Sequence, residues 1–115
     1  MGSVMFVDET TAGGRSDGWG MEIAEERLAL SELIRRRIFQ EVAESEAARS
    51  RLVRPAGDGG RVDPQAQTEA ALAAFGRNGF LVLVGDRQIT ELDEEIDLPL
   101  GTEVTFLKLV ALVGG

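Results

Sequence analysis

The chain ends in Gly114-Gly115, directly behind an apolar run at residues 104–112 that predicts a last β-strand. Because glycine carries no Cβ, this pair forms a slim, uncharged stalk that can enter a channel too narrow for any larger side chain. An adenylating enzyme could then reach the carboxylate of Gly115 and activate it as an acyl-adenylate. Glycine is also common at frayed chain ends. The upstream elements have to decide between these two interpretations.

Other chemistry has little to work with in this chain. Cysteine and histidine are both absent, so thiolate nucleophiles, imidazole bases, disulfides and the usual zinc ligands are excluded. Catalysis would have to run on carboxylates, hydroxyls or arginines. Asp93 and Asp97 are a candidate acid and base, but nothing in the sequence places either in a dry pocket that would shift its pKa. We therefore predict a protein that is not an enzyme and has neither a cofactor nor a metal site.

The charge balance limits the partners. Twelve Lys and Arg stand against 20 Asp and Glu, a formal net charge of −8. Such a balance argues against nonspecific nucleic-acid binding, which needs clustered basic residues. No apolar stretch approaches the roughly 20 residues of a membrane span, and no basic-then-apolar leader opens the chain. The sequence predicts a cytoplasmic protein of one domain over residues 1–115, without membrane contact.

The first half of the chain predicts a hairpin and a helix. Short strands are expected at 4–7 and 19–24, joined by a long tip with turn residues. Ser31 is the expected N-cap of the helix. Its apolar stripe is Leu33, Ile34, Ile38 and Val42. The opposite, solvated face is expected to hold Arg35, Arg36, Arg37, Glu41 and Glu44.

An irregular, Gly-rich segment at residues 50–63 predicts a flexible excursion. The Gly-Asp-Gly-Gly at 57–60 is not a phosphate loop, because no Lys-Ser/Thr follows it. Asp63-Pro64 then predicts the start of a second helix, with an N-cap and a proline in the first turn. This helix is expected to stop at Gly76 or at 78–79.

The last third of the chain predicts three strands. Residues 80–84 are continuously apolar, Gly85-Asp86 makes a tight reversal, and 87–89 starts a return strand. The acidic segment 91–97 lacks the spacing of a calcium loop and is expected to be solvated surface. A turn at 99–101 leads into the final strand. Hairpin, two helices and three strands indicate an α+β fold whose first and last strands lie side by side, parallel, in the middle of a mixed sheet.

Several motifs in this part of the chain carry a resemblance to a known family. They are Glu-Ala-Ala-Leu at 69–72, Phe-Leu-Val-Leu-Val at 80–84, Gly-Asp-Arg-Gln at 85–88, Leu-Gly-Thr-Glu-Val-Thr-Phe at 100–106 and Val-Gly-Gly at 113–115. In this combination the chain resembles the C-terminal half of β-grasp proteins, which include ubiquitin-like modifiers and the small sulphur carriers of molybdopterin and thiamin synthesis. The order of elements fits over most of the chain, and the motif-level similarity covers residues 69–115.

The resemblance implies a ubiquitin-like fold and a function as an enzyme substrate. The fold would be a mixed sheet of four to five strands on one main helix, with a second helix before the C-terminal strands and a tail at 111–115. An ATP-dependent activating enzyme would adenylate Gly115. In a modifier the carboxylate would pass through a cysteine thioester to an amine of a target protein, with a conjugating enzyme and a processing protease as further partners.

Two alternatives stay open beside the modifier. In a sulphur carrier the same carboxylate would become a thiocarboxylate for a sulphur-accepting synthase. A noncovalent, self-assembling scaffold of this fold would form homo-oligomers and would keep working without Gly114-Gly115. The excursion and the long first hairpin make the chain larger than a typical sulphur carrier, which favours a ubiquitin-like modifier of bacterial type.

Side-chain alternation predicts a partner surface on the last strand. Val104 and Phe106 should point one way, and Leu107 and Leu109 the other. If the helix covers only the first pair, the second pair lies on the open face of the sheet, ahead of Val113 and the diglycine. That face would bind the activating enzyme or a second copy, unless the excursion folds over it.

Lys108 is the sole lysine of the chain. Conjugation needs an amine that can lose its proton, which arginine does not do at ordinary pH. We therefore expect the chain to label other proteins, or to assemble noncovalently, more readily than it forms branched polymers. A genome rich in G and C, which replaces lysine with arginine throughout, would produce the same composition.

Overall fold

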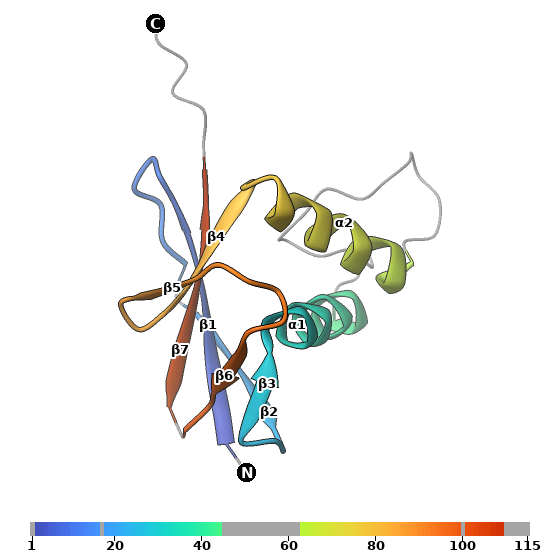
Figure 1. The fold of residues 1–115 in the computed structure, drawn as a ribbon, viewed down its shortest axis with the longest axis vertical. Helices are drawn as coiled ribbons and strands as arrows, with labels where there is room; N and C mark the ends of the chain where they lie inside the picture. Colours follow the sequence, from blue (N-terminus) through green and yellow to red (C-terminus); the bar gives the residue numbers. More distant parts are fainter. Residues whose placement is uncertain (1, 17, 45–62, 100, 110–115) are drawn as a thin grey trace, which may run out of the picture.

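The computed structural model describes residues 2–16, 18–44, 63–99 and 101–109, which form a mixed sheet, a small second sheet and two helices (Figure 1). The helices are α1 (Leu30–Glu44) and α2 (Pro64–Gly76). The strands are β1 (Gly2–Thr10), β2 (Trp19–Ile23), β3 (Arg27–Ala29), β4 (Phe80–Val84), β5 (Arg87–Ile89), β6 (Glu95–Asp97) and β7 (Thr102–Lys108). The predicted α+β class is confirmed.

The first and last strands form the centre of the main sheet. Its order is β2-β1-β7-β4-β5, with β1 and β7 parallel and the other neighbours antiparallel. The parallel register runs from Val4 opposite Thr102 to Thr10 opposite Lys108. Parallel strands cannot be joined by a tight turn, so the chain has to cross over between them. Both helices lie in this crossover, and both cover the same face of the sheet (Figure 1).

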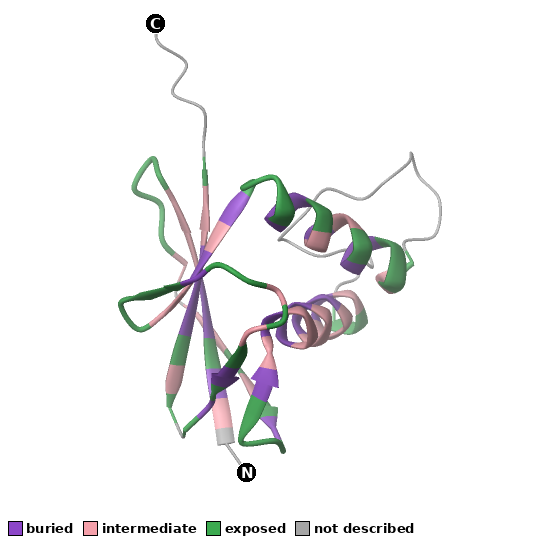
Figure 2. Ribbon diagram, in the orientation of Figure 1, coloured by how far each residue is buried: buried purple, intermediate pink, exposed green. Residues whose placement is uncertain are grey.

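The core lies between that face and the helices. Inward-pointing residues at alternate positions of the central strands are buried, and Figure 2 shows buried stretches along these strands and on the helices. The sheet contributes Val4, Phe6, Phe80, Val82, Val104 and Phe106, and α1 contributes Leu30, Leu33, Ile34 and Ile38. The ring of Phe106 lies 5.7 Å from that of Phe6 and 6.0 Å from that of Phe80. The predicted inward orientation of Val104 and Phe106 is confirmed.

Strand β1 is longer than the predicted strand at 4–7. Asp8, Glu9 and Thr10 read as turn residues in isolation, yet all three pair with β7. Tertiary pairing overrides local turn preference here, since each added residue gains a partner in the parallel ladder. The second strand of the hairpin lies close to its predicted bounds.

Helix α1 begins at Leu30, two residues before the start that an N-cap at Ser31 predicts, so Ser31 is not its N-cap. The amide of Leu30 donates to the Glu94 carbonyl at 3.0 Å, and that of Ser31 donates to the Leu92 carbonyl at 2.9 Å. Backbone oxygens of the acidic segment therefore satisfy the first helical amides, which otherwise need a side-chain cap.

The acidic segment contains a strand that the sequence analysis did not predict. β6 pairs antiparallel with β3 in the second sheet. Ile96 on β6 and Leu98 beyond it are buried, whereas Glu95 and Asp97 are exposed. The expected solvated surface is present, but the segment also contributes apolar anchors, so four strands follow α2 instead of three.

Local signals placed α2 and the β4–β5 reversal correctly. Asp63 caps the helix by accepting a hydrogen bond from the amide of Gln65 at 3.1 Å, and Pro64 occupies the first turn. The helix ends at Gly76, and Gly85 has a φ of 62° in the tight turn that follows β4. The expected excursion at 50–63 lies outside the described residues apart from Asp63. Neither described helix is long and apolar enough to cross a membrane.

Removing the side chain at the two predicted N-caps should change stability to different extents. We expect Asp63→Ala to lower the free energy of unfolding by about 1 kcal/mol, because the Gln65 amide loses its acceptor. Ser31→Ala should change it by less than about 0.5 kcal/mol, because carbonyl oxygens already cap α1. Urea unfolding followed by the fluorescence of Trp19 measures both. Equal losses in the two variants would contradict this account of the helix ends.

Candidate functional site

Four leucines lie on the face of the sheet that the helices leave open. On β4, Leu81 and Leu83 alternate with inward residues, and Leu81 is the register partner of Leu107 on β7. Leu109 continues the alternation beyond the end of β7. We call Leu81, Leu83, Leu107 and Leu109 the outer leucine patch. Three of them are half-buried and Leu109 is 44% exposed.

A polar strip separates this patch from the rest of the open face. Arg15, in the β1–β2 connection, forms ion pairs with Glu9 on β1 and Glu103 on β7. A side chain joined to both has to cross the rung between them, where Val7 faces Thr105. Val7 and Thr105 are buried, and Gly18 of the β1–β2 connection lies close to Val7, since a Cβ at Gly18 would stand 3.3 Å from Val7 Cγ2. Beyond the strip, Met5 is 41% exposed.

The last described residues are held by segments on both sides of β7. The amide of Thr11 donates to the carbonyl of Lys108 at 3.0 Å, and the amide of Leu109 donates to the carbonyl of Gly79 at 3.5 Å. The end of β7 is thus fixed between the β1–β2 connection and the α2–β4 turn. Val113, Gly114 and Gly115 lie outside the described residues. An extended chain from 110 to 115 spans at most about 20 Å.

The sole lysine belongs to the opposite face. Lys108 pairs with Phe80 on β4 and with Thr10 on β1, both at positions that share the inward orientation of Phe106. Its residue is half-buried. The side chain of Lys108 therefore leaves β7 on the face opposite to the outer leucine patch.

A fully buried arginine lies under the end of β7. Arg37 of α1 is 0% exposed and places two nitrogens on the carboxylate of Asp8, at 2.6 and 2.7 Å. The same guanidinium donates to Glu41 at 3.1 and 3.3 Å. Its central carbon lies 4.4 Å from the ring centroid of Phe106 and 6.0 Å from that of Trp19. We call Asp8, Arg37 and Glu41 the buried charge cluster.

Electrostatic interactions keep Arg37 positively charged. Burial lowers the pKa of Arg37, but the hydrogen bonds and charges of Asp8 and Glu41 outweigh it and hold the pKa above its ordinary value. The guanidinium face also lies over the electron-rich ring of Phe106, which adds a cation–π attraction. The observed hydrogen bonds of Arg37 thus all end on carboxylate oxygens, and its face lies against an aromatic ring. These contacts compensate for the water that a buried ion loses.

The sequence analysis was wrong about Arg37 and Glu41, which it placed on the solvated face of the helix. The buried positions of α1 are 30, 33, 34, 37, 38 and 41. Their spacing is that of a single helical stripe, in which Arg37 and Glu41 take two places. This spacing was the available signal. The charges of Arg37 and Glu41 indicated a solvated face. No residue near Arg37 in the sequence indicated that Asp8, on β1, would be its partner.

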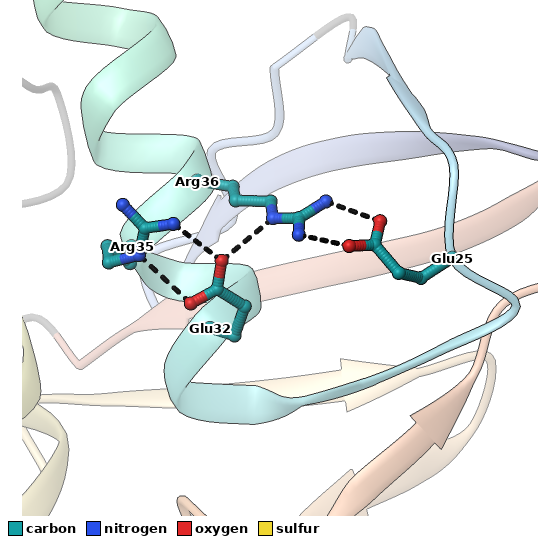
Figure 3. A network of polar contacts seen from close by, with 4 residues as sticks. All are labelled: Glu25, Glu32, Arg35 and Arg36. Carbon is teal, nitrogen blue, oxygen red and sulfur yellow. Dashed lines mark hydrogen bonds and ion pairs between the residues drawn. The ribbon is translucent and has the colours of Figure 1, made fainter.

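The neighbouring arginines do lie at the surface, in a second network (Figure 3). Arg36 binds Glu25 with two nitrogens, at 2.7 and 2.5 Å, and Glu32 with its Nε at 2.8 Å. Arg35 binds Glu32 with two nitrogens, at 2.9 and 2.7 Å. The hydrogen bond from Arg35, with that from Arg36, lowers the pKa of Glu32 to about 2 against the raising effect of burial.

Asp93 and Asp97, the candidate acid and base, do not lie in a dry pocket. Asp93 and Asp97 are both exposed, and Asp97 is ion-paired with Arg27 at 2.8 Å. In the part of the chain that the structure describes, no three His, Cys, Asp or Glu residues are grouped so that they could hold a metal ion. The features with functional potential are therefore the outer leucine patch and the held end of β7. Leu81 and Leu83 were not predicted as part of this surface, because the sequence of one strand does not show its register with a neighbouring strand.

Comparison of the chain with models of protein families, with curated proteins and with solved structures finds no match in any of the three.

The surface network makes stability depend on pH in a defined window. We expect Glu32→Gln to lower the free energy of unfolding by about 1 kcal/mol at neutral pH, as is typical of partly exposed ion pairs. The folded-state pKa of Glu32 is about 2 and its ordinary value is 4.5. The contribution of its carboxylate is thus complete above about pH 4.5 and is lost as the pH falls toward 2.

Urea unfolding of wild type and Glu32→Gln at a series of pH values measures this difference. The two curves should converge as the solution is made acid. A stability gap that stays the same from neutral pH down to about pH 2 would show that the charge of Glu32 is not its cause.

Proposed function

We propose that this chain is a ubiquitin-like modifier of bacterial type, activated at the carboxylate of Gly115 by an ATP-dependent adenylating enzyme. The observation that carries the proposal is the position of β7. This last strand runs through the centre of the sheet, and its end is held on both sides beside the outer leucine patch. An activating enzyme could bind the patch and receive the chain that continues from Leu109.

The arrangement of the elements supports a β-grasp assignment. The resemblance implies a mixed sheet of four to five strands on one main helix. The structure has a five-stranded mixed sheet whose parallel first and last strands are central, with the helices in the crossover between them. The second helix is part of that expectation, and the β3–β6 sheet is an addition to it. In Figure 1, α2 lies on the helix side of the main sheet and the β3–β6 sheet lies toward the lower end of the view.

The proposed reaction has two stages. The carboxylate of Gly115 attacks the α-phosphorus of ATP, pyrophosphate leaves, and an acyl-adenylate forms. A cysteine thiolate of the enzyme then displaces AMP to give a thioester, which an amine of the target attacks to form an amide and release the thiol. The chain itself supplies only the carboxylate and the surface that positions it, in keeping with its lack of cysteine and histidine.

The position of Lys108 argues for single additions. An acceptor lysine has to present a deprotonated amine to the thioester without obstruction. Lys108 is half-buried on the helix side of β7, next to the strand end that the activating enzyme would occupy. Chains linked through Lys108 are therefore disfavoured.

The principal experiment compares intact masses in the native host. Tagged wild type and a variant lacking Gly114-Gly115 are purified under denaturing conditions. We expect wild type to yield species heavier by one whole target protein, absent from the deletion variant and unchanged by Lys108→Arg. A mass shift equal to replacing one oxygen with sulphur would assign a sulphur carrier instead. Unmodified masses for both would refute activation and leave the noncovalent scaffold.

A matched pair of surface variants tests the outer leucine patch. Leu109 and Met5 are exposed to nearly the same extent, 44% and 41%. They lie on opposite sides of the polar strip that Arg15 forms with Glu9 and Glu103. We expect Leu109→Ser and Met5→Ser each to change the free energy of unfolding by less than about 0.5 kcal/mol. Only Leu109→Ser should reduce the yield of conjugates, by roughly tenfold, as losing one apolar anchor of a docking surface typically does. Equal yields in both variants would contradict docking at the patch.

A further inference from the structure

The buried charge cluster lies where the end of β7 is positioned. Asp8 and Phe106 are register partners on the two central strands, and Arg37 contacts both. Only two further rungs, at Leu107 and Lys108, separate this point from the end of β7. Arg37 therefore joins α1 to both central strands just below the place where the chain leaves the sheet.

We propose that Arg37, held by Asp8 and Glu41, is a positioning residue that fixes the end of β7. This inference deepens the proposed function and takes its functional meaning from it. The physical claim about the strand end can nevertheless be tested on the isolated protein.

The geometry of the cluster is directional, unlike the rest of the helix–sheet contact. A guanidinium is planar, and two of its nitrogens match the two oxygens of Asp8. Its face meets the ring of Phe106 at 4.4 Å. These contacts fix both the distance and the rotation of α1 over the two strands. The surrounding leucine, isoleucine and valine contacts are non-directional and would allow small sliding movements.

Stability alone gives a weak reason for such a cluster. Arg37 and Glu41 are removed from water and Asp8 is 20% exposed, so forming the cluster carries a large desolvation penalty. Well-packed apolar residues in place of such buried ions are often equally stable or more so. Breaking the cluster by removing only one member leaves an unpaired buried charge and is destabilising. A variant in which all three members become apolar therefore separates orientation from stability.

Arg36 supplies the matched control. It too binds two carboxylates, those of Glu25 and Glu32, from the adjacent position of the same helix. Its network lies at the surface near the start of α1 and makes no contact with the central strands among the bonds observed. Removing that network changes the same residue types without touching the end of β7.

Amide hydrogen exchange on the purified protein is the test. The Thr11 amide reports the strand end, because it donates to the Lys108 carbonyl, whereas the Leu98 amide donates to the Glu26 carbonyl in a different segment. Because the thermal midpoint reports global stability separately, the ratio of the two exchange rates shows whether the strand end opens more than the other segment. It is measured in wild type, in Asp8→Val/Arg37→Met/Glu41→Met and in the control Glu25→Gln/Glu32→Gln/Arg36→Met.

We expect the apolar triple variant to raise the Thr11-to-Leu98 ratio at least about tenfold, with a thermal midpoint no lower than that of wild type, and the control to change the ratio less than about twofold. An unchanged ratio in the triple variant would overturn the proposal. If the triple variant does not fold, Arg37→Lys decides by the same ratio, since lysine keeps the charge but lacks the planar pair of donors.

The native host supplies the functional readout. With its stability intact, the apolar triple variant should yield at least about fivefold less C-terminal adduct than wild type, and the control should match wild type. Full yield from the triple variant would overturn the positioning role. If wild type forms no adduct at all, the proposed function fails, while the exchange ratio still decides whether Arg37 fixes the strand end.

Discussion

The parallel pairing of β1 with β7 is the constraint on which the rest of the structure depends. Because parallel neighbours need a long crossover, everything between them is arranged around that pair, with both helices on one face (Figure 1). One face is thereby filled with phenylalanine, isoleucine and valine, and the other stays open. Because β7 is a central strand, it ends in the middle of the sheet, beside the outer leucine patch.

Two arginines one residue apart show how position decides what a charge does. Arg36 lies at the surface, where its ion pairs with Glu25 and Glu32 compete with water and contribute modestly to stability. Arg37 faces the sheet, where its partners Asp8 and Glu41 must neutralise a charge that water cannot reach. The first network holds the start of the helix, and the second joins the helix to the central strands.

The sequence predicted those parts of the fold that are governed by local chemistry. Asp63-Pro64 and Gly85 gave correct boundaries, because caps and tight turns depend on a few adjacent residues. Ser31 misled, since the amides at the start of α1 are satisfied by carbonyl oxygens more than 60 residues away in the chain. Tertiary partners likewise decided β6 and the burial of Arg37. Leu107 and Leu109 were recognised from alternation alone, whereas Leu81 required the β4–β7 register.

The central claim is that an enzyme activates the carboxylate of Gly115, and trapping with hydroxylamine tests it most directly. Purified chain is incubated with an extract of the native host, ATP and hydroxylamine, and its C-terminal peptide is analysed by mass spectrometry. Hydroxylamine displaces AMP from an acyl-adenylate, or a thiol from a thioester, and leaves a terminal hydroxamate. The account predicts a hydroxamate on Gly115 that requires ATP. A free carboxylate on Gly115 in an extract that activates other substrates would contradict it.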